Sequence, residues 1–207
     1  MADAAYEAIS KAKRQVEGGN VKGAVETLES YLETDPHNVK PRLQLANIAY
    51  YNLKDTNYGD MQMNVVLDLE PDNVDALKAS VTVLLKDKKN NKLTDERFVK
   101  LLKLSPSAEL YGMYAVFLKM QMLDFPKAAE YYEMAIALNP NKYEYHQNYA
   151  VLLLNDFRDY EKAKHELEEV MRLKPGDAKI KKNYDMLLKK KFDKNGNLKK
   201  SKIPFKK

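Results

Sequence analysis

The hydrophobic positions of this chain recur at three- and four-residue spacing, which is typical of one face of an α-helix. In the stretch before Pro36, apolar side chains stand at Ala24, Leu28 and Leu32. A second stripe of the same kind lies upstream, and the glycines at 18–19 separate the two. Because glycine favours turns, this pattern predicts two short helices joined by a tight turn.

The prolines show that this helix pair is repeated. Five of the eight recur with gaps of 35, 35, 34 and 35 residues, at Pro36, Pro71, Pro106, Pro140 and Pro175. An apolar helical stripe precedes each of them, so each proline marks the end of one helix and the turn before the next. The repeat predicts five helix pairs, at about residues 5–38, 39–73, 74–107, 108–142 and 143–177.

Small residues stand at matching places on the two helices of a pair. They lie twelve residues apart in the first pair and thirteen apart in three later ones, at Ala12 and Ala24, Ala46 and Gly59, Ala115 and Ala128, and Ala150 and Ala163. Small side chains let two antiparallel helices approach closely. We therefore expect the second residue of each of these pairs to be buried where the helices touch.

The third pair departs from this pattern. A long polar segment, residues 86–92, separates its two helices, and Thr94 stands where the other pairs have a small residue. Threonine is a common N-cap. We therefore expect the second helix of this pair to begin near Thr94.

The chain ends with a different pattern. A last helical stripe runs over residues 178–192, with Ile180, Tyr184, Leu187 and Leu188 on one face and lysines on the other. The end of a repeat stack needs a polar outer face, so this stretch predicts a capping helix. Residues 193–207 have no periodicity, and we expect them to form a flexible basic tail.

These features resemble the tetratricopeptide-repeat (TPR) family, whose unit is a helix-turn-helix of about 34 residues that ends in a proline. The resemblance covers about residues 5–177. It implies an all-α fold, a right-handed α-solenoid of antiparallel helix pairs with about eleven helices. The first helices lack the tryptophan of the family, and the residues at those places are Ala8, Arg42, Leu77, Tyr111 and His146.

The composition excludes most chemical functions. The chain has no cysteine, which excludes disulfides, thiolate metal sites and cysteine nucleophiles, and it has only three histidines. His165 has Glu161 and Glu169 one helical turn away on either side, but no third metal ligand accompanies them. No glycine-rich phosphate loop is present. We therefore expect no enzymatic activity, no cofactor and no metal.

The sequence shows no membrane or export signal. No apolar stretch reaches the ~18 residues that a membrane-spanning helix needs. The N-terminus lacks the basic start and apolar block of a secretory signal. These features predict a cytoplasmic protein.

The resemblance also implies where a partner would bind. In TPR proteins the first helices line a concave groove that holds a segment of a partner protein. Carried over to this chain, that groove contains Asn47, Tyr50, Tyr51, Met113, Gln147, Asn148, Lys179 and Asn183. Amide side chains can bond to a peptide backbone, and tyrosine supplies rigid contact area. We therefore expect a non-catalytic scaffold for a protein or peptide partner.

One subclass of the family fits poorly. Chaperone adaptors hold the terminal carboxylate of a partner with five residues on three successive first helices. At the C-terminal end of this array Asn148 and Lys179 match that set, but Gly112, Val116 and Asn183 do not. We do not expect a carboxylate clamp, and a weaker preference for acidic peptides stays open at that end.

The distribution of charge leaves an alternative function open. The net charge is +5, but residues 178–207 contain 12 lysines and two aspartates, which leaves residues 1–177 net acidic. Such a basic end could attach the chain to nucleic acid or ribosomes through phosphate contacts. The candidate residues are Lys189, Lys190, Lys191, Lys199, Lys200 and Lys202. No arginine accompanies them, so no readout of base sequence is predicted.

Overall fold

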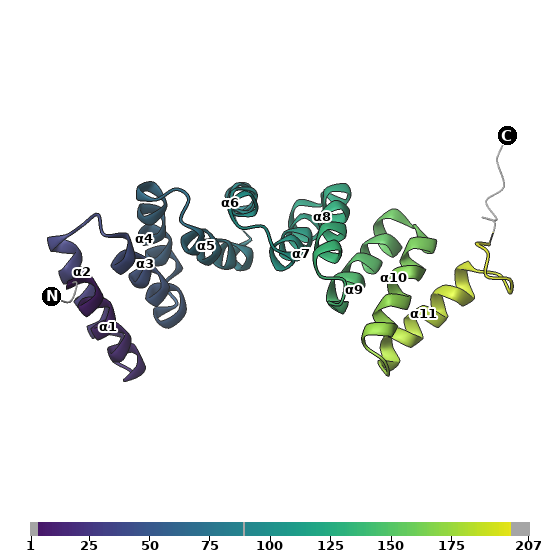
Figure 1. Cartoon of the computed structure of the whole chain (residues 1–207), viewed down its shortest axis with the longest axis horizontal. Helices are drawn as coiled ribbons and strands as arrows, with labels where there is room; N and C mark the ends of the chain where they lie inside the picture. The colour runs from purple at the N-terminus through teal and green to yellow at the C-terminus, as the bar shows by residue number, and fades with distance from the viewer. Residues whose placement is uncertain (1–3, 89, 200–207) are drawn as a thin grey trace. The chain divides into compact units, whose positions relative to one another are not determined.

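The computed structural model describes residues 4–88 and 90–199, and these contain eleven α-helices (Figure 1). Within this part of the chain the only β-type pairing is an isolated bridge between Phe192 and Leu198. The predicted all-α class and number of helices are confirmed. The helices group into two compact units, which divide between Ser105 and Pro106.

The first unit contains six helices, which pack in consecutive pairs. They are α1 (Ala4–Glu17), α2 (Val21–Thr34), α3 (Val39–Ile48), α4 (Thr56–Leu69), α5 (Val74–Asp87) and α6 (Asn91–Leu104). Helix α2 also packs on α3, and α4 on α5, so each pair stacks on the next. One core cluster joins the first two pairs through Leu28, Leu45 and Ile48, and a second joins Met63 and Val66 to Ala76.

The second unit contains two helix pairs and a last single helix. Its helices are α7 (Ala108–Phe117), α8 (Phe125–Leu138), α9 (Tyr143–Leu152), α10 (Tyr160–Leu173) and α11 (Ala178–Lys191). Helices α8 and α9 join the two pairs, and α11 packs on α10. Ile180 and Leu187 of α11 are buried in one cluster with Leu167 and Val170 of α10, as expected of a helix that covers an apolar face.

The predicted burial of the small residues on the second helices is confirmed. Ala24, Ala128 and Ala163 have no exposed surface, and Gly59 is buried as well. Gly59 cannot be an alanine like the other three without a rearrangement, because a Cβ there would lie 2.3 Å from Cδ1 of Tyr50. The tyrosine ring occupies the space that a methyl group fills in the other pairs.

Three first helices end in a π-helical turn. These turns are η1 (Ala49–Leu53), η2 (Leu118–Met122) and η3 (Leu153–Phe157). After each comes a residue in the left-handed conformation, with φ between 56° and 61°, namely Lys54, Leu123 and Arg158. These three pairs are those whose small residues lie thirteen apart in the sequence. The additional residue is thus accommodated in the last turn of the first helix.

An aspartate then begins the second helix of each of these pairs. The side chains of Asp55, Asp124 and Asp159 accept hydrogen bonds from backbone N–H groups three residues later, at 3.0–3.2 Å. Their own N–H groups donate back to the first residue of each π-helical turn at 3.0 Å. One residue therefore satisfies the carbonyl end of one helix and the amide end of the next.

The start of α6 corrects a sequence-based expectation. The helix begins at Asn91 and not near Thr94. Oδ1 of Asn90 accepts the N–H of Leu93 at 3.3 Å, so Asn90 is the N-cap. Thr94 lies buried in the first turn of the helix and donates its hydroxyl to the carbonyl of Asn90 at 2.9 Å. The expectation was wrong because asparagine caps at least as well as threonine and occurs one turn earlier.

A tight turn follows α11. The carboxylate of Asp193 accepts the backbone N–H groups of Asn195 and Asn197 at 2.8 and 2.9 Å. The chain then returns toward α11, where the N–H of Lys199 donates to the carbonyl of Lys191 at 2.8 Å. Residues 193–199, which the sequence placed in a tail, therefore have a defined backbone path beside the end of α11. The rest of that tail lies outside the described residues.

Candidate functional site

The described surface has several hollows, and first helices line most of their walls. In the first unit, a hollow of about 390 Å³ lies between α1 and the segment formed by α3 and η1. Its walls include Lys13, Gln44, Asn47 and Tyr51. A second hollow of about 310 Å³ lies on the other side of Tyr51, toward Val83 of α5.

In the second unit, a hollow of about 580 Å³ lies between α7 and α9. Met113 and Val116 form part of one wall, and Tyr145 and Asn148 part of the other. Gly112 lies against the ring of Tyr145, since a Cβ on this glycine would be 2.6 Å from Cε1 of the ring. Glycine therefore allows α7 and α9 to come close at the floor of this hollow.

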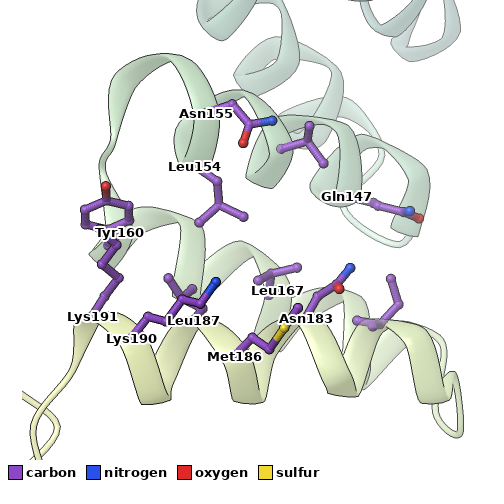
Figure 2. Close-up of a pocket in the computed structure, with 12 residues that line it drawn as sticks. Gln147, Leu154, Asn155, Tyr160, Leu167, Asn183, Met186, Leu187, Lys190 and Lys191 are labelled. Carbon is purple, nitrogen blue, oxygen red and sulfur yellow. The ribbon is translucent and has the colours of Figure 1, made fainter.

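A further groove in the second unit has an apolar floor and is referred to below as the α9–α11 groove. It measures about 400 Å³. Its residues are Gln147, Val151, Leu154, Asn155, Tyr160, Leu167, Ile180, Asn183, Met186, Leu187, Lys190 and Lys191. Figure 2 shows Leu154 and Asn155 on one side, facing Asn183 and Leu187 of α11 on the other.

Seven of the eight groove residues predicted from the sequence line one of these hollows. Asn47, Tyr50 and Tyr51 line those of the first unit. In the second unit the structure brings Met113 together with Asn148, and Gln147 together with Asn183. Lys179 lines none of them; it is exposed at the start of α11, where its backbone N–H donates to the capping side chain of Asp177 at 3.0 Å.

Tyr50 has a structural position at the edge of its hollow. Only 5% of this residue is exposed, and its hydroxyl donates to Oδ1 of Asp60 at 2.6 Å. Burial, followed by this hydrogen bond, raises the pKa of Tyr50 well above its ordinary value. One edge of the Tyr50 ring packs against Gly59, so Tyr51, which is 44% exposed, offers a partner more surface.

The basic candidates do not form one uniform patch. Lys190 and Lys191 line the α9–α11 groove, and Nζ of Lys191 lies 4.2 Å from the centre of the Tyr160 ring. Nζ of Lys199 donates to the carbonyl of Lys189 at 2.5 Å. Lys200 and Lys202 lie outside the described residues.

Sequence reasoning missed Met186 in the α9–α11 groove. Val151 and Met186 are 38% and 42% exposed, although both are large hydrophobic residues. The signal was present in α11, where Asn183, Met186 and Lys190 follow one another at helical spacing. The sequence assigned Asn183 to the groove and Lys190 to the basic candidates, but Met186 between them was not singled out.

Within residues 4–88 and 90–199, no group of three or more histidine, aspartate or glutamate residues is arranged to hold a metal ion. In the same part of the chain, no helix has both the length and the apolar character needed to cross a bilayer.

Solved structures of other proteins identify the fold. No family model matches the sequence, and no curated protein matches it. MamA from Desulfovibrio magneticus RS-1 superimposes with a TM-score of 0.72 at 22% identity, over 86% of this chain and 99% of that one. YrrB is described as "a TPR protein with an unusual peptide-binding site". It superimposes with a TM-score of 0.65 at 20% identity, over 80% of this chain and 84% of that one.

PilF from Pseudomonas aeruginosa is similar to the same extent. Its TM-score is 0.66 at 20% identity, over 90% of this chain and 83% of that one. These superpositions establish the fold. The chain has the TPR fold, and the resemblance seen in its repeats is confirmed at that level.

Proposed function

We propose that this chain is a non-catalytic scaffold that binds a segment of a partner protein along its first helices. One observation carries this proposal: the hollows between first helices combine amide side chains with apolar ones, and so does the α9–α11 groove, where α9 and η3 face the last helix. Amides can satisfy the backbone of a bound peptide, while apolar surface supplies the favourable burial.

Two further points support this proposal. YrrB, which shares the fold, is described as having a peptide-binding site. The candidate residues Met113 and Asn148 come from different helices but line one hollow, which gives a bound segment two walls to contact. The alternative, attachment to nucleic acid through the lysines, has weaker support because Lys190 and Lys191 border apolar surface and Lys199 bonds to the backbone.

Site-specific photo-crosslinking tests the proposal. Met113 on α7 lines a hollow, whereas Met134 on α8 is 42% exposed on a second helix and lines none of the hollows described above. Each is replaced by p-benzoylphenylalanine in the full chain, and irradiation is carried out in extract of the cells that make it. We expect a protein adduct at position 113 and none at position 134. Equal adducts at positions 113 and 134, or no adduct at 113 and none when Tyr51 and Met186 are replaced in the same way, would contradict binding along the first helices.

A further inference from the structure

The α9–α11 groove has a chemical character that selects among possible partners. Its floor is formed by buried leucine and isoleucine side chains, Leu167, Ile180 and Leu187, which are 4–7% exposed. Its walls present Val151 and Met186, which keep more than a third of their surface exposed. A partner that covers these two residues removes apolar surface from water, which favours binding.

The charged residues of this groove all have the same sign. Among its described lining residues, the ionisable side chains are Tyr160, Lys190 and Lys191, and neither aspartate nor glutamate is present. Lys191 lies over the ring of Tyr160, and this contact holds one positive charge at the end of the groove (Figure 2). Lys190 is exposed on the same wall. The groove therefore attracts negative charge and disfavours basic partners.

The exposed face of α11 extends this character. Lys179, Asn183, Met186 and Lys190 are spaced by four, three and four residues, so they share one face of the helix. Along that face the order is positive, amide, apolar, positive. A bound segment would therefore meet a hydrophobic side chain between two cations.

We propose that the α9–α11 groove binds a partner segment in which apolar side chains are flanked by aspartate or glutamate. This inference rests on the proposed function and names the chemistry of its partner. Val151 and Met186 would contact the apolar side chains, Lys190 and Lys191 the carboxylates, and Gln147 and Asn183 the backbone. These contacts need no terminal carboxylate, so an internal segment of a protein would bind as well as a chain end.

Selection from a random peptide library, with the full chain as bait, tests this chemistry. The library displays 16-residue peptides inside a carrier protein, so no free C-terminus is present. Three variants are compared with the wild type: Lys190→Glu and Met186→Glu in the groove, and Lys181→Glu as the matched control. Lys181 is exposed on the same helix but does not line the groove. Thermal unfolding of each variant confirms that it is folded.

We expect the wild type to enrich peptides with apolar residues flanked by aspartate or glutamate. Enriched peptides, synthesised with amidated ends, should lose at least about tenfold in affinity with Lys190→Glu and with Met186→Glu. With Lys181→Glu the affinity of these peptides should change by less than about twofold.

Three other results would overturn the inference in different ways. Enrichment of neutral or basic peptides would show that the chemistry is wrong while the scaffold function stands. Acidic peptides whose affinity is unchanged by both groove variants but falls with Tyr51→Ala would assign the binding to the first unit. If no peptide is enriched and a random-sequence RNA binds in a Lys190-dependent manner, the inference and the proposed function both fail.

Discussion

His146 of α9 and Glu166 of α10 form a buried pair that joins the two helices, with Nδ1 of the ring 2.7 Å from Oε2 of the carboxyl group. Nε2 of the same ring lies 2.9 Å from the carbonyl oxygen of Pro140. A carbonyl oxygen only accepts hydrogen bonds, so Nε2 carries a hydrogen, and the contact at Nδ1 shares a proton with the carboxyl group.

Arg42 makes the same two connections in the second repeat. Its Nη2 donates to the carbonyl of Pro36 at 2.6 Å, and its Nη1 donates to Oε1 of Gln62 at 2.7 Å. In both repeats the partners lie six residues upstream and twenty residues downstream. Arg42 and His146 stand where the TPR family has tryptophan, so a polar side chain here ties the preceding turn to the second helix.

A double-mutant cycle should reveal the coupling between His146 and Glu166. His146→Phe leaves the buried carboxyl group without its partner, and we expect it to lower the free energy of unfolding by about 3 kcal/mol. Combined with Glu166→Leu, the loss should be smaller than the sum of the two single losses by at least about 1 kcal/mol. Urea unfolding measures all four proteins. Single losses that simply add would show that the two side chains are independent.

Gly59 and Tyr50 should depend on each other. Gly59→Ala in the wild type places a methyl group against the tyrosine ring and should destabilise the chain by about 1–3 kcal/mol. In a Tyr50→Ala background the clash is absent, and the same change should stabilise by up to about 1 kcal/mol, because alanine favours the helix. Urea unfolding of Gly59→Ala in both backgrounds checks whether the change in free energy of unfolding reverses its sign. Destabilisation by the same amount in both would rule out the ring as the cause.

Replacing Leu123 with glycine should increase the stability of the fold. It has φ of 56° and is 66% exposed, so its side chain loses little by removal, while its backbone conformation disfavours an L-residue. We expect Leu123→Gly to stabilise the chain by about 0.5 kcal/mol. Met134→Gly, in an exposed helical position, should instead destabilise it by about 1 kcal/mol. If both changes shift the melting temperature downward equally, the left-handed residue carries no strain.

The ion pair between Glu133 and Lys162 should give a defined pH dependence. Hydrogen bonds from Lys162 and then from Tyr149 lower the pKa of Glu133, and the bond to Glu133 raises the pKa of Lys162. A lowered carboxyl pKa stabilises the fold above the unfolded pKa, and this contribution is lost as the pH falls through the folded pKa.

The comparison of wild type with Glu133→Gln isolates this effect. The wild type should be the more stable from about pH 5 to about pH 10, and the difference should disappear as the medium becomes more acidic than pH 4. It should also shrink at high salt, because both side chains are about half exposed. A difference that does not change between pH 7 and pH 3 would show that the charge of Glu133 is not involved.

The sequence predicted most helices because their stripes and small residues repeat with the proline period. It did not predict the division after Ser105, because Pro106 has the same spacing and the same apolar context as the other four prolines. The groove residues of the first helices followed from their place in the repeat. Met186 did not, because the exposure of a hydrophobic side chain depends on how neighbouring helices cover it.

The π-helical turns allow a repeat to be one residue longer without changing how the α-helical part of its first helix packs. One residue added inside an α-helix would rotate every later side chain by about 100° and shift it by about 1.5 Å. Here the added residue is confined to η1, η2 and η3, so the register of the α-helical part before each turn is unchanged, and the turns themselves still contact the second helix. An insertion at this point therefore leaves the earlier contacts in register, and repeats that differ by one residue can stack in one array.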